Sequence, residues 1–175
     1  MLEADSHKIL CACDPCATRF ESVVAGRFRL IPRDARGLPD FSLTNERWES
    51  LALPINMAFF FRSIAAGGIV AMYPGPDGAL EYLLSAEYWK ALEEANPALA
   101  HIKPEVEALL VNRVDEARDY FVAPIDRCYE LAEAIRQRWR GLSGGELVGR
   151  EISRFFSRLR EQAGPVLEFQ EASHA

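Results

Sequence analysis

The residues of this chain most suited to chemistry are three cysteines that lie close together, Cys11, Cys13 and Cys16. The Cys13-x-x-Cys16 spacing lets one tight turn bring two thiolates to a single metal ion at about 2.3 Å, and zinc ribbons supply half of their ligands in this way. If the chain is extended up to the turn, Cys11 and Cys13 point to the same side, so Cys11 could offer a third thiolate. His7 is the candidate for the fourth ligand. We therefore expect a metal site built from these four residues, with zinc as the metal and iron as the alternative.

Two other interpretations of the cysteine cluster stay open. A Cys-x-x-Cys pair at the start of a helix lowers the thiol pKa, so Cys13 and Cys16 could form a redox pair, although no parallel βαβ unit of the thioredoxin kind surrounds them. The cluster could also consist of structural thiols. The remaining cysteine, Cys128, lies on the apolar face of a predicted helix and is expected to be a buried core residue rather than a ligand.

Composition places the chain among acidic globular proteins. Its 175 residues carry a formal net charge of -6, and 49% of them are hydrophobic, which is enough for a sizeable core. Such a chain lacks the surplus of Lys and Arg that non-specific nucleic-acid binding requires. The longest apolar runs are far shorter than a membrane span, and the first residues do not form an export signal. We therefore expect a cytoplasmic protein with reduced thiols that binds neither nucleic acid nor membranes.

The sequence gives little support for catalysis. Its three histidines are far apart, and no serine has the glycine frame of a nucleophile elbow. The segment 142–146 (LSGGE) resembles the signature loop of ATP-binding-cassette ATPases, but no lysine belongs to a phosphate loop. Helix capping explains the same residues, with Ser143 as the N-cap and Glu146 as its capping-box partner. We therefore expect a non-enzymatic protein.

Hydrophobic periodicity and turn residues predict a mixed α and β domain. A loop from Arg33 to Phe41 is followed by helices capped at Thr44 and Ser85. Apolar residues on both faces place the strand from Asn56 to Arg62 in the centre of a sheet. Residues 74–78 are rich in Pro and Gly and predict an antiparallel hairpin whose loop is longer than two residues. The predicted strands after the cysteine cluster are 26–31, 56–62, 68–73, 80–84, 105–112 and 119–123.

The last third of the chain is predicted to be helical. One amphipathic helix begins after Asp126 and ends near Gly141, and a second runs from Gly144 to about Ala163. The inward face of the second helix is formed by Leu147, Val148, Ile152, Phe155, Phe156 and Leu159. Its outward face is formed by Arg150, Arg154 and Arg158.

These elements predict an α+β fold with an antiparallel sheet of about five to seven strands, on which the two C-terminal amphipathic helices pack. A small cysteine knuckle precedes it. We expect three parts: a partial, half zinc-ribbon-like knuckle at residues 1–24, a single α+β domain at 25–165 and a flexible tail at 166–175.

Motifs spread over nearly the whole chain carry a resemblance to a protein family. They are residues 11–16 (CACDPC), 57–62 (MAFFFR), 73–74 (YP), 106–112 (VEALLVN), 122–129 (VAPIDRCY) and 139–145 (WRGLSGG). Together they resemble an uncharacterised bacterial family of small proteins encoded beside nickel-iron hydrogenase genes. Longer members carry an upstream Cys-x-x-Cys and a His-containing stretch. The resemblance implies that Cys13 and Cys16 match the second half of a zinc ribbon, so that His7, Cys11, a second copy of the chain or a partner protein would supply the other ligands.

The leading hypothesis is a non-enzymatic accessory or assembly protein of the nickel-iron hydrogenase system. It would act as a protein-binding module with a zinc knuckle. Its partner would be a hydrogenase subunit or a maturation factor, and the chain could also form a homodimer. One alternative is a thiol or iron-based redox helper that protects or feeds a hydrogenase metallocentre. Another is a metal-free scaffold.

Overall fold

The computed structural model describes residues 1–3, 8–23, 27–75, 77–139 and 145–163 and contains two antiparallel sheets. The small sheet has the strand order β2-β1-β3, and the large sheet has the order β4-β9-β8-β5-β6-β7. The small sheet comprises β1 (Leu2–Glu3), β2 (Lys8–Ile9) and β3 (Phe28–Arg29). The large sheet comprises β4 (Arg36–Gly37), β5 (Met57–Ser63), β6 (Gly68–Gly75), β7 (Gly78–Leu83), β8 (Glu107–Asn112) and β9 (Asp119–Pro124). The predicted α+β class is confirmed.

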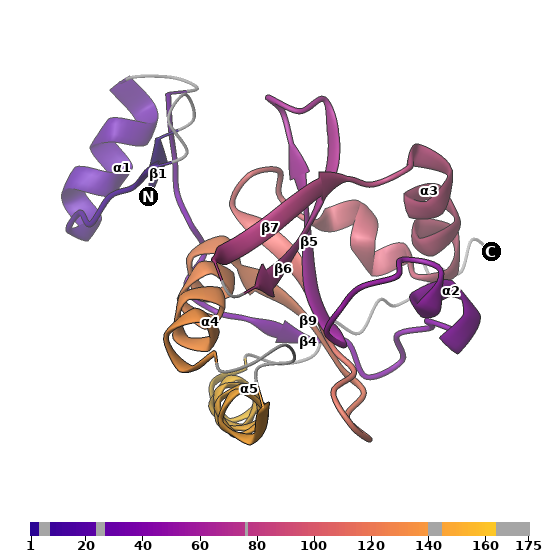
Figure 1. The fold of residues 1–175 in the computed structure, drawn as a ribbon. Coiled ribbons are helices and arrows are strands. Elements are labelled where there is room, and N and C mark those ends of the chain that lie inside the picture. Colours follow the sequence, from indigo (N-terminus) through magenta and orange to yellow (C-terminus); the bar gives the residue numbers. More distant parts are fainter. Residues whose placement is uncertain (4–7, 24–26, 76, 140–144, 164–175) are drawn as a thin grey trace.

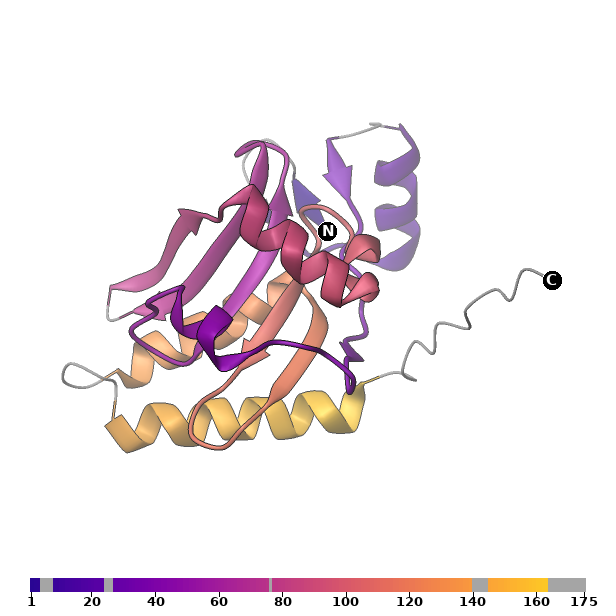
Figure 2. The ribbon, with the colours of Figure 1, turned by 90° about the vertical axis from the view of Figure 1, so that its right-hand side faces the viewer.

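Helices lie on both faces of the large sheet (Figures 1 and 2). The helices are α1 (Asp14–Val23), α2 (Asn45–Glu49), α3 (Ala86–Ala95), the 3-10 helix η1 (Pro97–His101), α4 (Ile125–Arg138) and α5 (Gly145–Gln162). The two C-terminal helices pack on one face, as predicted, while α2, α3 and η1 cover the other. None of these helices combines the length and the hydropathy that crossing a bilayer requires.

Strand β5 shows how the sheet divides two hydrophobic cores. Its side chains alternate between faces, so Phe59 and Phe61 pack against α4 and α5, whereas Phe60 lies in the core beneath α2 and α3. Both faces are covered, which explains why this strand is apolar along most of its length. The predicted central position is confirmed, because β5 pairs with β8 on one side and with β6 on the other.

The predicted caps of two helices are also confirmed. The Thr44 hydroxyl accepts a hydrogen bond from the Arg47 backbone N–H at 3.2 Å, and the Ser85 hydroxyl accepts one from the Tyr88 N–H at 3.1 Å. Each side chain thereby pairs one of the N–H groups that a helix start leaves without an intrahelical acceptor. The predictions for Ser143, Gly144 and Gly141 lie outside the described residues, as do those for His7 and for the tail at 166–175.

Three features differ from the prediction. The segment expected to be a loop contains β4, where Arg36 lies opposite Val122 of β9; so short a strand has no alternation to reveal it. The β6–β7 register continues to Gly75 opposite Gly78, which leaves two residues between the strands instead of the longer loop expected. Leu147 was expected to face inward but is 50% exposed, because it lies in the first turn of α5, on the side away from the core.

A buried ion pair fixes β4 to the large sheet. The Arg36 guanidinium lies 2.8 Å from Oε1 of Glu107, a β8 side chain that is 2% exposed. The other carboxylate oxygen of Glu107 accepts a hydrogen bond from the Lys103 backbone N–H at 2.9 Å. The chain that connects the small N-terminal sheet to the main domain is thus anchored by a charge pair that reaches across β9, from β4 to β8.

Candidate functional site

The cysteine cluster lies in a small N-terminal unit formed by β1, β2, β3 and α1, which Figure 1 shows beside the main sheet. The backbones of Met1 and Leu10 exchange hydrogen bonds of 3.0 and 2.8 Å, which continue the β1–β2 pairing and bring the chain to Cys11. An exposed ion pair of 3.0 Å joins Glu3 of β1 to Arg27, next to β3. Leu2 is the one buried side chain among those described before Arg33.

Helix α1 brings Cys13 and Cys16 together. The Ala17 N–H donates to the Cys13 carbonyl at 2.9 Å, so Cys13 immediately precedes the helix and Cys16 lies in its first turn. Residues three apart at a helix start lie on the same side, and the two thiols share a hydrogen bond. Both side chains are exposed. The predicted convergence of this pair is therefore present, at a helix N-terminus where backbone N–H groups favour negative charge.

The hydrogen bond between the thiols affects their acidity. The hydrogen bond with Cys13, and then the charge of Cys13, raise the pKa of the Cys16 thiol above its ordinary value. This direction is opposite to the lowering expected for a Cys-x-x-Cys at a helix start. The cause is electrostatic: a negative charge on one sulfur disfavours a second negative charge on the other.

The other two predicted ligands are Cys11 and His7. Cys11 is exposed, and His7 lies outside the described residues. Within the described ranges, no three His, Cys, Asp or Glu side chains are grouped in a way that would hold a metal ion. The cluster thus offers two sulfur ligands at one point, which is half of a tetrahedral zinc site.

Cys128 has the opposite environment, as predicted. It is a buried member of the core between α4 and the large sheet, with a relative exposure of 1%. Burial, and to a lesser degree the neighbouring charge of Asp126, raise the pKa of the Cys128 thiol far above its ordinary range. A protonated, enclosed thiol is a packing residue and not a nucleophile.

Arg150, Arg154 and Arg158 of α5 are exposed, as predicted, but they differ in their contacts. Arg150 forms an ion pair with Glu146 at 3.2 Å, and Arg154 forms one with Glu151 at 3.6 Å. Arg158 instead lines a cleft between α4 and α5 together with Arg127. The spacing of the arginines in the sequence indicated one wall of this cleft, the exposed face of α5. The other wall, from α4, could not be predicted, because it depends on how the two helices pack.

Comparison with known proteins identifies the family of this chain. A model described as "Family of unknown function (DUF5947)" matches residues 1–163, and the chain belongs to this family. Neither the curated proteins nor the solved structures contain a significant match.

Proposed function

We propose that this member of the DUF5947 family is a non-enzymatic accessory protein of the nickel-iron hydrogenase system, which binds its protein partner through the N-terminal cysteine motif. The observation that carries the proposal is the meeting of Cys13 and Cys16, both exposed, at the start of α1. The link to hydrogenase comes from the motif resemblance described for the sequence. In this proposal the protein works in the cytoplasm, where its thiols stay reduced.

Zinc is the metal that this pair would suit. Two thiolates from one helix start provide half of the four ligands of a structural zinc ion. The other two would come from His7 and Cys11, from a second copy of the chain, or from the hydrogenase subunit or maturation factor that it binds. A site completed by the partner would couple metal binding to complex formation, because neither protein alone would satisfy the metal.

Affinity capture from a host that expresses the hydrogenase operon tests this proposal. We expect the native chain to recover a hydrogenase subunit or maturation factor with stoichiometric zinc in the complex. The double variant Cys13→Ser, Cys16→Ser should lose both. Ala17→Ser is the matched control, because it places the same side chain on the next position of α1 and leaves the thiols intact. Recovery of no hydrogenase component by the native chain would overturn the proposal, and equal recovery by the double variant would favour the metal-free scaffold.

The hydrogen bond between the thiols also favours a second candidate, a thiol redox helper. Oxidation of Cys13 and Cys16 to a disulfide would release two electrons and two protons to an acceptor such as a disulfide of the partner. The two sulfurs lie within hydrogen-bonding distance of each other, as required of a pair in which one sulfur attacks and the other resolves the mixed disulfide. Iron held by the same sulfurs would be the other redox form.

Elemental analysis and redox titration separate the two candidates. Zinc in the purified complex, with no thiol oxidation in a glutathione redox buffer, supports the binding module. A reversible mass loss of two hydrogens that Cys13→Ala abolishes supports the thiol helper, and iron with a visible absorption band supports the iron-based form.

A further inference from the structure

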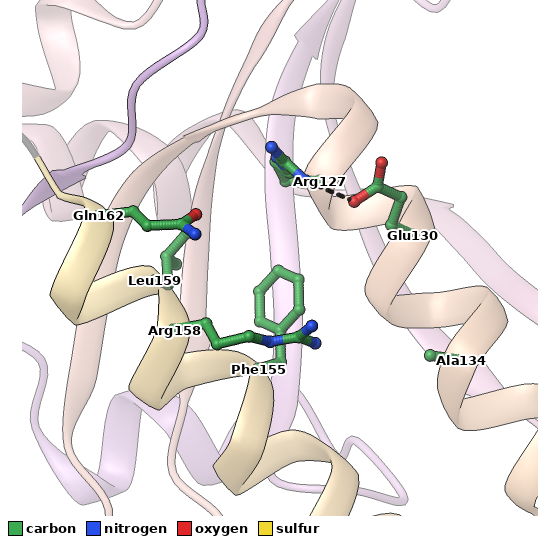
Figure 3. A pocket seen from close by; sticks show the side chains of 7 residues that line it. All are labelled: Arg127, Glu130, Ala134, Phe155, Arg158, Leu159 and Gln162. Carbon is green, nitrogen blue, oxygen red and sulfur yellow. Dashed lines mark hydrogen bonds and ion pairs between the residues drawn. The ribbon is translucent and has the colours of Figure 1, made fainter.

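A positively charged cleft separates helices α4 and α5 on the surface of the main domain, far in sequence from the cysteine motif. Its volume is about 300 Å³, and it is lined by Arg127 and Glu130 of α4 and by Phe155, Arg158 and Gln162 of α5, among others. Figure 3 shows the two arginines reaching into the space between the helices, with the Phe155 ring beside Arg158. We call this space the α4–α5 cleft.

The cleft continues past Arg127 toward the segment that precedes β4. A second hollow of about 350 Å³ shares Arg127, Leu159 and Gln162 with it and extends to Arg33 and Asp34. The two hollows therefore form an elongated groove along the last two turns of α5. From Phe155 to Gln162 the helix rises by about 10 Å, which matches roughly three residues of an extended peptide.

The charge of this groove differs from that of the whole chain. The protein has a net charge of -6, yet the groove contains three arginines and two carboxylates. Glu130 is engaged by Arg127 at 3.0 Å. Arg158 has no ion pair or hydrogen bond to a side chain of the described ranges, and its charge acts at longer range on Glu151, whose pKa it helps to lower. Its guanidinium thus offers a planar set of donors to a carboxylate from outside.

The remaining lining adds apolar and hydrogen-bonding features. Phe155 and Leu159 are 8% and 6% exposed, so their outer surfaces form an apolar floor without leaving the core. The Gln162 side-chain amide can both donate to and accept from a peptide backbone. Arginines above an apolar floor suit a ligand that alternates acidic and apolar side chains.

We propose that the α4–α5 cleft is a docking site for an extended acidic peptide segment of a partner protein, whose carboxylates pair with Arg158 and Arg127. This inference goes beyond the proposed function, because it uses none of the cysteines and would stand without a link to hydrogenase. It gives the protein a second recognition surface on its rigid domain.

Fluorescence anisotropy with a labelled hexapeptide of alternating glutamate and leucine tests the proposal on the full chain. We expect saturable binding that weakens as salt rises, and no binding of the same peptide with glutamine in place of glutamate. Arg158→Gln should weaken binding about tenfold, the usual effect of losing one charge-assisted contact. Arg154→Gln is the matched control, because it removes another exposed arginine, one turn earlier, that pairs with Glu151 and lies outside the cleft.

A gain-of-binding variant keeps the test independent of any loss of folding. Glu130→Gln frees Arg127 from its ion pair and removes a negative charge, so binding should tighten about threefold. Equal binding to the native chain and to Arg158→Gln would overturn the proposal, as would equal binding of the glutamine peptide. If inorganic phosphate at matched concentration displaced the peptide completely, the cleft would be a simple oxyanion site and the peptide proposal would be wrong.

Discussion

The N-terminal unit and the main domain hold their cysteines in opposite ways. Cys13 and Cys16 are exposed at the start of α1, in a unit built from strands of two residues and a single helix. Cys128 lies between α4 and a six-stranded sheet with a core on each face. The exposed thiols thus lie where few apolar side chains are buried, whereas the enclosed thiol is part of an extensive core.

The largest contrast should be in thiol reactivity. On treatment with iodoacetamide at about pH 8, we expect Cys128 to react at least about a thousand times more slowly than the three N-terminal cysteines, because it is enclosed and its pKa is raised by burial. Peptide mass spectrometry after timed labelling measures each rate. Labelling in urea provides the control, since all four rates should then converge. Rapid native labelling of Cys128 would remove the contrast.

Core substitutions should separate the stabilities of the two regions. Phe156→Ala creates a cavity beneath α5 and should lower the free energy of unfolding by about 3–5 kcal/mol. Leu2→Ala should change it by less than about 0.5 kcal/mol when unfolding is followed by tryptophan fluorescence. All three tryptophans lie in the main domain, so this signal reports on that region. Equal losses in the two variants would show that the regions unfold as one unit.

The link between the regions should depend on the Arg36–Glu107 pair. Arg36→Ala leaves a buried carboxylate without its counter-charge and should cost about 3 kcal/mol in urea unfolding. Adding Glu107→Gln removes that charge and should restore part of the loss. The matched control is Arg62→Ala, which breaks an exposed pair with Glu93 and should cost less than about 1 kcal/mol. If both arginine variants behaved alike, the buried pair would not be the anchor.

The smallest effect should distinguish the two thiols of the motif. Because Cys13 raises the pKa of Cys16, less of the Cys16 thiol is ionised at a given pH than in an isolated cysteine. Cys13→Ala removes the cause, so the alkylation profile of Cys16 should move to lower pH and its rate at about pH 8 should rise. Cys11→Ala should leave the profile in place. A shift to higher pH in the Cys13 variant would contradict the hydrogen bond between the thiols.

Much of the fold follows from local patterns in the sequence. The run Phe59-Phe60-Phe61 between turn residues predicts a strand covered on both faces, and the caps at Thr44 and Ser85 mark helix starts. These predictions succeed because the burial period and the capping chemistry depend on neighbours within a few residues. The exposure of Leu147 was not predicted. The spacing of apolar residues along α5 defines an apolar face, but it does not show how far along the helix the core extends.

By itself, the sequence determined the α+β class, most helices and strands of the main domain, the buried state of Cys128 and the proximity of Cys13 to Cys16, since residues three apart meet in a tight turn as well as at a helix start. Tertiary structure decided the rest. Strand β4 exists because β9 offers it backbone hydrogen-bonding partners. The α4–α5 cleft joins Arg127 to Arg158 across 31 positions of sequence, and contacts at that separation depend on the packing of whole helices.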